Sequence, residues 1–373
     1  MPLTSPIAPL GAADEYRRSL DSASSSRVAV VGGGAWGTTL SALASATGPT
    51  TLWAREPAVV ETVRDRHENQ QFMPNVVLPD ALGVTNELRQ AVTGADVVVV
   101  AVPAQHVRSV MAEAGPWIKP GTLVVSVTKG LEVGSGLRMT EVLADVLGSA
   151  HAPFIGVLAG PNLAREVIAG QPSATTVAFA DPACAAAVQQ RLSCATFRVY
   201  TSTDVIGCEI GGAVKNAIAI AAGVAVGLGS GMNTMAALVT RGLAELTRLG
   251  VALGGDPFTF LGLAGNGDLI ATCGSSRSRN QRVGRELAKG WTTDEIVAGM
   301  TSVAEGIDSA PVIVELARRH GVEMPIVEMV SALLDGRIAA RDGITSLMSR
   351  QPRSELHDLH EVATLAGLER ARS

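Results

Sequence analysis

The chain has 373 residues, a length typical of about two domains, each large enough to bury a hydrophobic core. Hydrophobic residues make up 47% of the chain and charged residues 17%, a balance that excludes an intrinsically disordered protein. The formal net charge of −5 argues against a general nucleic-acid-binding or membrane-binding surface, because both partners attract basic surfaces.

The cysteines and the two ends of the chain carry little functional signal. The cysteines are Cys184, Cys194, Cys208 and Cys273. They form no C-x-x-C pair and have no metal-ligand spacing, so we expect reduced thiols in a cytoplasmic protein and no metal site. Residues 1–26 are rich in Pro, Ala and Ser and lack the pattern of a secretory signal, so we expect a mobile N-terminal arm. The charged segment 351–373 is expected to form a peripheral tail.

A glycine-rich turn follows the first apolar run. Residues 27–31 predict a β-strand and residues 38–46 a helix, and between them lie Gly32, Gly34 and Gly37 in a G-x-G-x-x-G pattern. This arrangement is typical of a dinucleotide-binding site, because the glycines permit a tight turn and the helix N-terminus offers N–H donors to a pyrophosphate. The alternative is a glycine-rich loop without a function.

The end of the second predicted strand bears on the choice of cofactor. Arg55 and Glu56 follow the strand at 50–54, about twenty residues after the glycine turn. An arginine here suits the 2′-phosphate of NADPH, whereas an acidic residue suits the ribose hydroxyls of NADH. We therefore expect NADP(H) to be preferred, with NAD(H) still open. A solvated charged turn is the alternative.

Strand-like and helix-like segments alternate up to about residue 203. The further predicted elements are strands at 95–103, 121–127, 154–158, 175–179 and 196–200 and helices at 137–147 and 182–192. This alternation predicts an α/β fold over residues 27–203, with a Rossmann-like, doubly wound and mostly parallel sheet. Ligands of such sheets bind outside the carboxyl ends of the strands, where Lys129 and Gly160 occur.

From about residue 204 the pattern becomes helical. Segment 210–228 is long enough to span a membrane, but its glycines and Lys215 favour a buried core helix. Later helices are predicted at 233–249, 293–300, 309–319, 325–334 and 345–348. We therefore expect a second, all-helical C-terminal domain at 204–350 and no membrane span.

Two lysines occur in settings that favour chemistry. Lys215 lies in an apolar segment where an unpaired ammonium is costly, and Lys129 directly follows a predicted strand. A carbonyl that receives a hydride needs a proton donor and a stabiliser of negative charge, and a lysine with a lowered pKa can serve as both. The alternatives are a Lys215 side chain that extends to solvent and a Lys129 that is an exposed loop cation.

A second polar cluster lies in the helical region. Asp268 occurs in a glycine-rich bend, from which a carboxylate can orient an ammonium group or hold a substrate hydroxyl. Ser278, Arg279 and Asn280 stand together at the start of a predicted helix, which suits a phosphate group. The alternative is a solvated basic helix face. A nucleic-acid patch is disfavoured, because no aromatic residues are interleaved.

Seven short motifs occur in a recognisable order. They are the glycine turn at 32–38, T-K-G at 128–130, G-P at 160–161, G-G-A-V-K-N at 211–216, G-N-G-D-L at 265–269, S-R-N at 278–280 and A-E-G at 304–306. Together they closely resemble bacterial-type NAD(P)-dependent glycerol-3-phosphate dehydrogenases, over about residues 28–350. The segments at 211–216 and 278–280 are specific to that family, whereas the glycine turn is not.

The resemblance implies a cytoplasmic enzyme that reversibly reduces dihydroxyacetone phosphate to sn-glycerol 3-phosphate for phospholipid synthesis. It implies that Lys215 donates and accepts the proton, and that Lys129 and Asp268 act with it. The implied substrate contacts are Lys129, Gly160, Asn162, Ala164, Lys215, Asn216, Asp268, Thr272, Ser278, Arg279 and Asn280. The implied cofactor contacts are Gly32, Gly34, Ala35, Trp36, Gly37, Arg55, Lys129, Arg279, Val303 and Glu305.

The chain also departs from the family pattern. Asn162 replaces a Ser or Thr, and Asn266 stands where a hydrophobic residue is commoner. A homodimer formed through the helical domain is expected from the family and from the apolar helices. Two other functions compete with the main hypothesis: a related hydroxyacid dehydrogenase with an unphosphorylated substrate, and a non-catalytic nucleotide-sensing protein.

Overall fold

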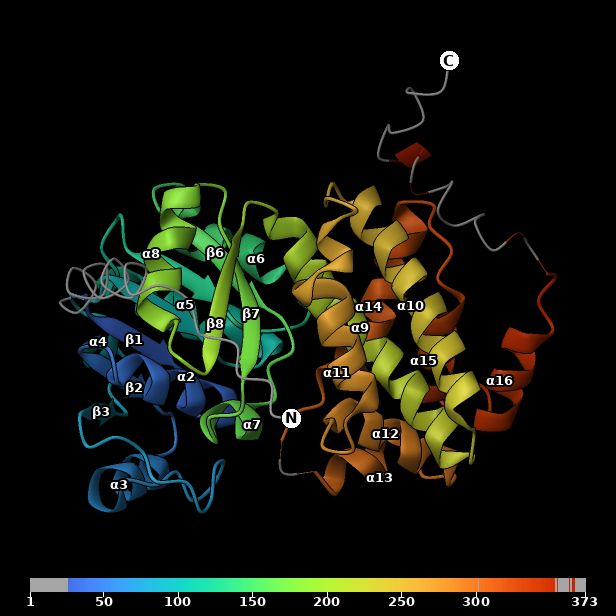
Figure 1. Ribbon diagram of the computed structural model, residues 1–373, viewed down its shortest axis with the longest axis horizontal. Helices are drawn as coiled ribbons and strands as arrows, with labels where there is room; N and C mark the ends of the chain where they lie inside the picture. Colours follow the sequence, from blue (N-terminus) through green and yellow to red (C-terminus); the bar gives the residue numbers. More distant parts are fainter. Residues whose placement is uncertain (1–25, 301, 353, 355–361, 363, 366–373) are drawn as a thin grey trace, which may run out of the picture.

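The computed structural model describes residues 26–300, 302–352, 354, 362, 364 and 365. The predicted N-terminal arm, apart from Ser26, and most of the predicted C-terminal tail lie outside this range. Figure 1 shows a sheet with helices on both faces, followed along the chain by a group of packed helices. The predicted Rossmann-like α/β fold with a helical C-terminal region is confirmed.

Eight strands form one sheet in the order β3-β2-β1-β4-β5-β6-β7-β8. The strands are β1 (Val28–Val31), β2 (Thr50–Trp53), β3 (Leu82–Thr85), β4 (Val97–Val100), β5 (Leu123–Ser126), β6 (Ile155–Ala159), β7 (Ser173–Ala178) and β8 (Phe197–Ser202). Neighbouring strands are parallel except β6 and β7, which are antiparallel. The strand order reverses between β1 and β4, and this switch point is where such sheets bind dinucleotides.

Strand β3 was not expected from the sequence. It lies at one edge of the sheet, and it pairs with β2 in the register Val84↔Leu52. Its sequence, Leu-Gly-Val-Thr, is short and contains a glycine, which weakens a strand signal. The strand therefore depends on its neighbour, which supplies the hydrogen bonds and the register.

Helices cover both faces of the sheet. They are α2 (Ala35–Ser45), α3 (Pro57–Arg66), α4 (Leu88–Val92), α5 (Ala104–Ala114), α6 (Met139–Leu147), α7 (Ala164–Ile168) and α8 (Pro182–Leu192), with short 3₁₀ turns at Gly115–Trp117 and Ala152–Phe154. Val28 and Val30 of β1 pack in one core with α2, α3 and α8, whereas Ala29 and Val31 pack in another with α4, α5 and α6. Burial on both faces explains why β1 and β4 are continuous apolar runs.

Helix α9 (Val205–Gly227) is the centre of the helical part (Figure 1). It is long and apolar enough to cross a membrane, but 89% of its most apolar stretch is buried inside the fold, as expected for a core helix. The elements that follow it are α10 (Met232–Ala252), a 3₁₀ turn at Thr259–Leu261, a π-helical turn at Leu263–Gly267, α11 (Asp268–Gly274), α12 (Arg279–Ala288), α13 (Thr293–Ala298), α14 (Glu305–Arg319), α15 (Pro325–Leu334) and α16 (Ala340–Met348). Helices α10, α11, α12, α14 and α15 all contact α9.

Helices α9 and α12 approach each other main chain to main chain. A Cβ added at Gly223 of α9 would collide with the carbonyl oxygen of Gln281, and one added at Gly284 of α12 would collide with that of Ile220. Side chains larger than hydrogen are therefore excluded at both positions. This close packing places the first turn of α12, which carries the Ser-Arg-Asn motif, in a defined position relative to α9.

Candidate active site

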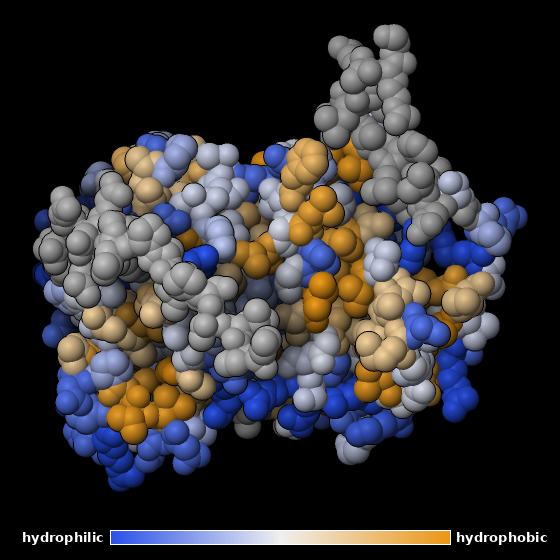
Figure 2. Space-filling view, viewed as in Figure 1, coloured by the Kyte–Doolittle hydropathy of each residue, from blue (hydrophilic) through white to orange (hydrophobic). Residues whose placement is uncertain are grey.

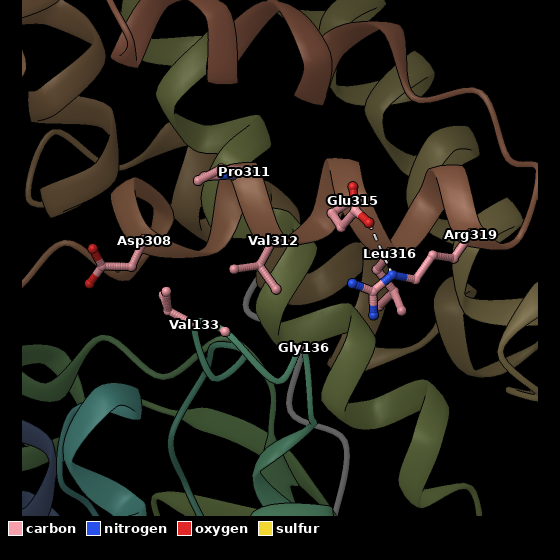
Figure 3. Close-up of a pocket in the computed structure, with 9 residues that line it drawn as sticks. Val133, Gly136, Asp308, Pro311, Val312, Glu315, Leu316 and Arg319 are labelled. Carbon is pink, nitrogen blue, oxygen red and sulfur yellow. Dashed lines mark hydrogen bonds and ion pairs between the residues drawn. The ribbon is translucent and has the colours of Figure 1, made fainter.

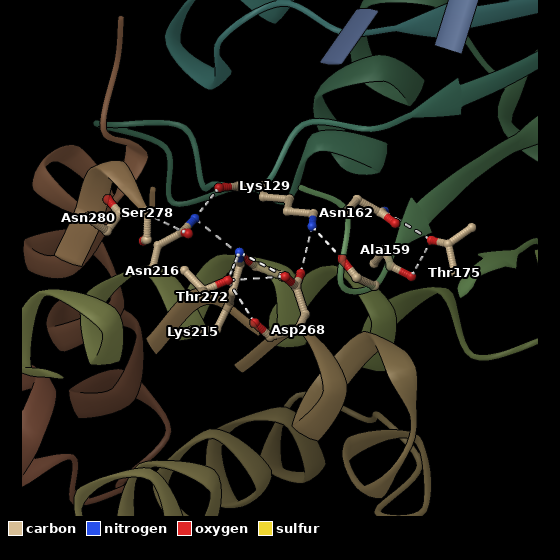
Figure 4. Close-up of polar contacts among 12 residues, drawn as sticks. Lys129, Ala159, Asn162, Thr175, Lys215, Asn216, Asp268, Thr272, Ser278 and Asn280 are labelled. Carbon is tan, nitrogen blue, oxygen red and sulfur yellow. Dashed lines mark hydrogen bonds and ion pairs between the residues drawn. The ribbon is translucent and has the colours of Figure 1, made fainter. Parts of the chain in front are cut away.

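Two lysines from different parts of the fold share one carboxylate. Lys129 follows β5, Lys215 lies in α9 and Asp268 is the first residue of α11. The Nζ of Lys129 lies 2.6 Å from Oδ2 of Asp268, and the Nζ of Lys215 lies 2.9 Å from Oδ1 (Figure 4). The Lys215 and Asp268 side chains are 7% and 2% exposed, so Lys215 does not extend to solvent. The structure thus brings together the three residues predicted to be catalytic.

The environment of Lys129 makes its proton easier to lose than that of a surface lysine. Burial lowers the pKa of Lys129 from 10.5 to about 8. The carboxylate of Asp268 acts in the opposite direction, and the nearby ammonium of Lys215 lowers the pKa further. Lys129 therefore remains mostly charged at pH 7 but titrates close to the physiological range.

Thr272 holds Lys215 in place from the next turn of α11. Its hydroxyl accepts a hydrogen bond from Nζ of Lys215 at 2.6 Å and donates one to the main-chain oxygen of Asp268 at 2.7 Å. Asp268 and Thr272 are four residues apart, so both face α9 from the same side of their helix. An ammonium group has three N–H donors, and these two acceptors fix its orientation.

A chain of amide groups connects the elements around the lysines. Nδ2 of Asn216 donates to the main-chain oxygen of Lys129 at 2.8 Å, and Nδ2 of Asn280 donates to Oδ1 of Asn216 at 2.8 Å. The main-chain N–H of Gly306 donates to Oδ1 of Asn280 at 3.1 Å. Asn216 and Asn280 were predicted to contact substrate, and here they join β5's loop to α9, α12 and α14.

The segment after β6 borders the same group of side chains. The carbonyl oxygen of Gly160 accepts a hydrogen bond from Nζ of Lys129 at 2.8 Å. Asn162 donates from Nδ2 to the hydroxyl of Thr175 at 3.0 Å, while its Oδ1 is buried without a hydrogen-bond partner in the described part of the chain. An acceptor in this position is available to a ligand hydroxyl. Ala164 begins α7, away from these hydrogen bonds.

The starts of α12 and α14 bring three further predicted residues together. Ser278 caps α12 by accepting from the N–H of Gln281 at 3.3 Å, and the exposed Arg279 follows it. Glu305 begins α14 and accepts from the N–H of Ala104 at 3.2 Å, which links α14 to the sheet part. Burial raises the pKa of Glu305 to about 7, and the guanidinium of Arg279 opposes this shift.

The glycine turn has the shape that a pyrophosphate needs. Gly32 has φ +125°, which favours glycine, and a Cβ there would meet the carbonyl of Ala101. A Cβ on Gly37 would collide with the carbonyl oxygen of Gly32, so α2 lies directly against the turn. At Gly34, the N-cap of α2, an added Cβ would meet nothing within 4 Å, so this side of the turn is open. These residues fit a bound dinucleotide.

The other predicted cofactor residues lie around this turn and near α14. Ala35 and Trp36 begin α2, and the indole ring of Trp36 packs edge-on against Phe197 at 6.1 Å between ring centres. Arg55, with 72% of its side chain exposed, forms an ion pair with Glu56 at 3.0 Å. Val303 is 41% exposed and precedes α14. Within the described residues, none of these side chains bonds to the two lysines or to the aspartate.

A buried ion-pair network was missed by sequence reasoning. Glu209, on α9, accepts from Nη1 of Arg138 at 2.6 Å and from the N–H of Thr140 at 2.8 Å. Arg138 also pairs with Glu141 at 2.8 Å. The network ties the start of α6 to the helix that carries Lys215. A charge at 209 in an apolar helix signals a buried partner, but nothing in the sequence indicates which one.

A cavity between the two parts of the molecule lies away from this group. It has a volume of about 270 Å³ and lies between α14 and the loop that follows Lys129 (Figure 3). Its lining includes Val133, Gly136, Pro311 and Leu316, and none of the predicted site residues. Asp308, Glu315 and Arg319 also line it, but the guanidinium of Arg319 is paired with Glu315 at 3.1 Å. Two carboxylates and one paired arginine do not favour a phosphorylated substrate.

Comparisons with known proteins agree with the geometry. The model of the NAD-dependent glycerol-3-phosphate dehydrogenase N-terminus matches residues 27–185, and that of the C-terminus matches residues 204–345. A curated NAD(P)+ glycerol-3-phosphate dehydrogenase from Sphingopyxis alaskensis is 51% identical over 89% of this chain and 98% of its own length. One from Thermobifida fusca is 48% identical over 88% of this chain and 98% of its own. The crystal structure of glycerol-3-phosphate dehydrogenase from Coxiella burnetii is 33% identical, with a TM-score of 0.82 over 87% of this chain and 99% of that chain.

Proposed function

Since the chain belongs to the NAD-dependent glycerol-3-phosphate dehydrogenase family, we propose that it reversibly reduces dihydroxyacetone phosphate to sn-glycerol 3-phosphate, with Lys215 as the proton donor. The observation that carries this proposal is the buried carboxylate of Asp268 between two ammonium groups. A purely structural ion pair needs one cation. The second cation supplies a positive charge that can face a substrate oxygen.

The roles of the site residues follow from their contacts. A bound NAD(P)H supplies the hydride to the substrate carbonyl carbon. Lys215, oriented by Asp268 and Thr272, gives a proton to the carbonyl oxygen as negative charge develops there. Lys129 stabilises the same charge, and Asp268 keeps both ammonium groups at the site. In the reverse reaction Lys215 receives the proton from the alcohol.

The substrate phosphate is proposed to bind at the start of α12. Arg279 is an exposed residue, and its guanidinium can form two parallel hydrogen bonds with phosphate oxygens, beside the N–H groups of the first turn. Ser278 caps this turn by accepting from the N–H of Gln281, and Asn280 joins it to α14 by accepting from the N–H of Gly306. We expect Arg279→Ala to raise the KM for dihydroxyacetone phosphate at least tenfold. An unchanged KM would favour the rival hydroxyacid dehydrogenase, whose substrate lacks a phosphate.

One experiment tests the reaction and the role of Lys215 together. Loss of the NADPH absorbance on mixing enzyme, NADPH and dihydroxyacetone phosphate reports turnover. We expect Lys215→Met to lower kcat by at least 1,000-fold, about 4 kcal/mol, while NADPH binding is kept. Lys289→Met is the matched control, because Lys289 is 58% exposed and pairs with Glu286 on the surface. Wild-type turnover in Lys215→Met would overturn the role, and NADPH binding without turnover in the wild type would favour a nucleotide sensor.

The preference for NADP(H) over NAD(H) is part of the proposal. It is supported by Arg55, an exposed guanidinium at the end of β2, which suits a ribose 2′-phosphate. Its ion pair with Glu56 weakens this attraction, because the carboxylate occupies the same donors. We expect a kcat/KM ratio moderately in favour of NADPH, lowered in Arg55→Ala and raised in Glu56→Gln. A wild-type preference for NADH would contradict this reasoning.

A homodimer formed through the helical part is also proposed. Exposed apolar side chains in this part include Met232, Phe258, Leu261 and Ile270. Figure 2 shows a hydrophobic band on this part of the surface, of a kind that marks protein–protein contacts. We expect light scattering after gel filtration to give twice the chain mass, and Phe258→Glu to lower it. A monomeric wild-type protein would contradict the dimer.

The cellular location and the metabolic role of the enzyme are also part of the proposal. We propose a cytoplasmic location and a role in phospholipid synthesis, since sn-glycerol 3-phosphate is the product. Restored growth of a glycerol-auxotrophic strain on expressing the chain, with the enzyme in the soluble fraction, tests both.

We place the domain boundary between residues 203 and 204, supported by the change there from strand β8 to helix α9. This division assigns residues 27–203 to cofactor binding and 204–350 to substrate binding.

A further inference from the structure

The side chain of Asn69 is fully buried beneath the glycine turn, although it belongs to a loop after α3. Its exposed fraction is 0%. Its Nδ2 donates to the carbonyl oxygen of Gly33 at 2.7 Å and to the hydroxyl of Thr38 at 2.8 Å. Its Oδ1 accepts from the N–H of Phe72 at 3.0 Å. A buried amide with all these partners is anchored to its own loop and to the turn.

Thr38 completes this arrangement from the first turn of α2. Its hydroxyl accepts from Asn69 and donates to the same Gly33 oxygen at 3.2 Å. The Gly33 carbonyl therefore receives two hydrogen bonds from fully buried side chains. Because each group in this small ring is paired, the ring holds one orientation of the Gly33–Gly34 peptide.

The orientation of that peptide decides what the turn can bind. In a planar trans peptide the C=O and the following N–H point in opposite directions. Anchoring the Gly33 oxygen inward, on Asn69 and Thr38, turns the N–H of Gly34 outward. The space beside the Cα of Gly34 is also open, since a Cβ there would meet nothing within 4 Å. This N–H lies at the N-cap of α2, where a pyrophosphate would be bound.

The glycines cannot hold this orientation themselves. Glycine occupies both signs of φ with similar ease, so a Gly-Gly peptide flips readily when it is free. A side chain at Gly33 is also excluded, because its Cβ would lie 2.6 Å from the Cβ of Ala54. The restraint must therefore come from residues distant in the sequence.

We propose that Asn69 is a positioning residue for the cofactor, which presets the Gly33–Gly34 peptide so that the Gly34 N–H faces the pyrophosphate. The inference rests on the proposed function only in taking a nicotinamide dinucleotide as the ligand. Without Asn69, binding has to order the peptide as well as the ligand, so affinity for the cofactor falls. Turnover at saturating cofactor is retained, because the lysine site is not touched.

Calorimetric titration of NADPH into the full-length enzyme tests this proposal independently of activity. We expect Asn69→Ala and Thr38→Val to raise the Kd for NADPH about tenfold, equivalent to about 1.4 kcal/mol. Thr38→Ser, which keeps the hydroxyl, should bind nearly as the wild type does. Val63→Ala, a cavity variant in the same layer of the fold, controls for general loss of stability. The KM for dihydroxyacetone phosphate should stay within about twofold in all four.

The outcomes separate positioning from simple stabilisation. A lower melting temperature with unchanged NADPH affinity in Asn69→Ala would overturn the proposal, and so would an equal loss of affinity in Val63→Ala. If Asn69→Ala does not fold, the pair Thr38→Val and Thr38→Ser decides, since both act on the same carbonyl oxygen. A wild-type protein that binds NADPH without reducing dihydroxyacetone phosphate would refute the proposed function and leave the role of Asn69 intact.

Discussion

Replacing Asp268 with Asn removes the carboxylate that the buried Lys215 and the partly buried Lys129 share, while it nearly preserves the size of the side chain. In the wild type this carboxylate raises the pKa of Lys129 against the effect of burial. Without it the pKa of Lys129 falls below its value of about 8, so a larger fraction of this lysine is neutral at pH 7. Lys215 loses its ion pair but keeps the hydroxyl of Thr272 as an acceptor.

The loss of stability that arises from Lys129 has an upper limit. One pKa unit corresponds to about 1.4 kcal/mol, and the pKa of Lys129 lies about one unit above pH 7. Releasing this proton in the folded state therefore costs on the order of 1 kcal/mol at pH 7, less than the roughly 3–5 kcal/mol typical of an unpaired buried charge. Activity should fall much further, by about 100- to 1,000-fold, because a preorganised charge at the reacting oxygen is lost.

Urea denaturation at several pH values, together with the NADPH absorbance assay, measures both effects. Between about pH 8 and pH 10.5 the unfolded wild type binds more protons at Lys129 than the folded protein, so this residue makes stability rise with pH. In Asp268→Asn the contribution of Lys129 to stability differs from that in the wild type only below about pH 8, where Lys129 of the wild type is still charged. The contribution of Lys129 to the stability difference should therefore shrink from pH 7 to pH 9. A difference that is constant over this range, or wild-type turnover in Asp268→Asn, would refute the reasoning.

Three further predictions concern the pH profile and the packing around the site. The kcat/KM for dihydroxyacetone phosphate should fall above about pH 8 as Lys129 loses its proton, and a flat profile up to pH 9 would contradict this role. Glu209→Ala should lower the calorimetric melting temperature far more than Glu141→Ala. Both carboxylates pair with Arg138, but the side chain of Glu209 is 5% exposed and that of Glu141 is 42% exposed. Equal shifts in melting temperature would argue against a stabilising role for the buried ion pair. Gly284→Ala should destabilise the protein in urea, although alanine usually favours a helix, because its Cβ meets main chain of α9. Gly274→Ala is the control, because a Cβ at Gly274 would meet nothing within 4 Å. Equal stability of the Gly284→Ala and Gly274→Ala variants would contradict the close packing of α12 against α9.

Local features of the sequence were sufficient to predict most of the fold. A valine run, three spaced glycines and a helical segment identify the dinucleotide-binding turn, because its geometry depends on neighbouring residues. The repeated apolar runs likewise predicted the mostly parallel sheet, since strands buried on both faces cannot alternate with polar residues. Lys215 was likewise predicted to be functional from its local sequence. A single ammonium in a long apolar helix is costly unless something is bound to it.

The partners of these residues were decided by the tertiary structure. Lys129 and Asp268 are 139 positions apart, and they meet because the end of β5 faces the start of α11. The clamp on Glu209 and the amide of Asn69 also join segments whose own sequences carry no sign of the contact. Periodicity and propensity describe one element at a time, whereas a buried hydrogen bond depends on how two elements pack. The sequence by itself therefore determined the elements and the candidate chemistry, and only their packing decided which charges meet, which amides position them and how the site titrates.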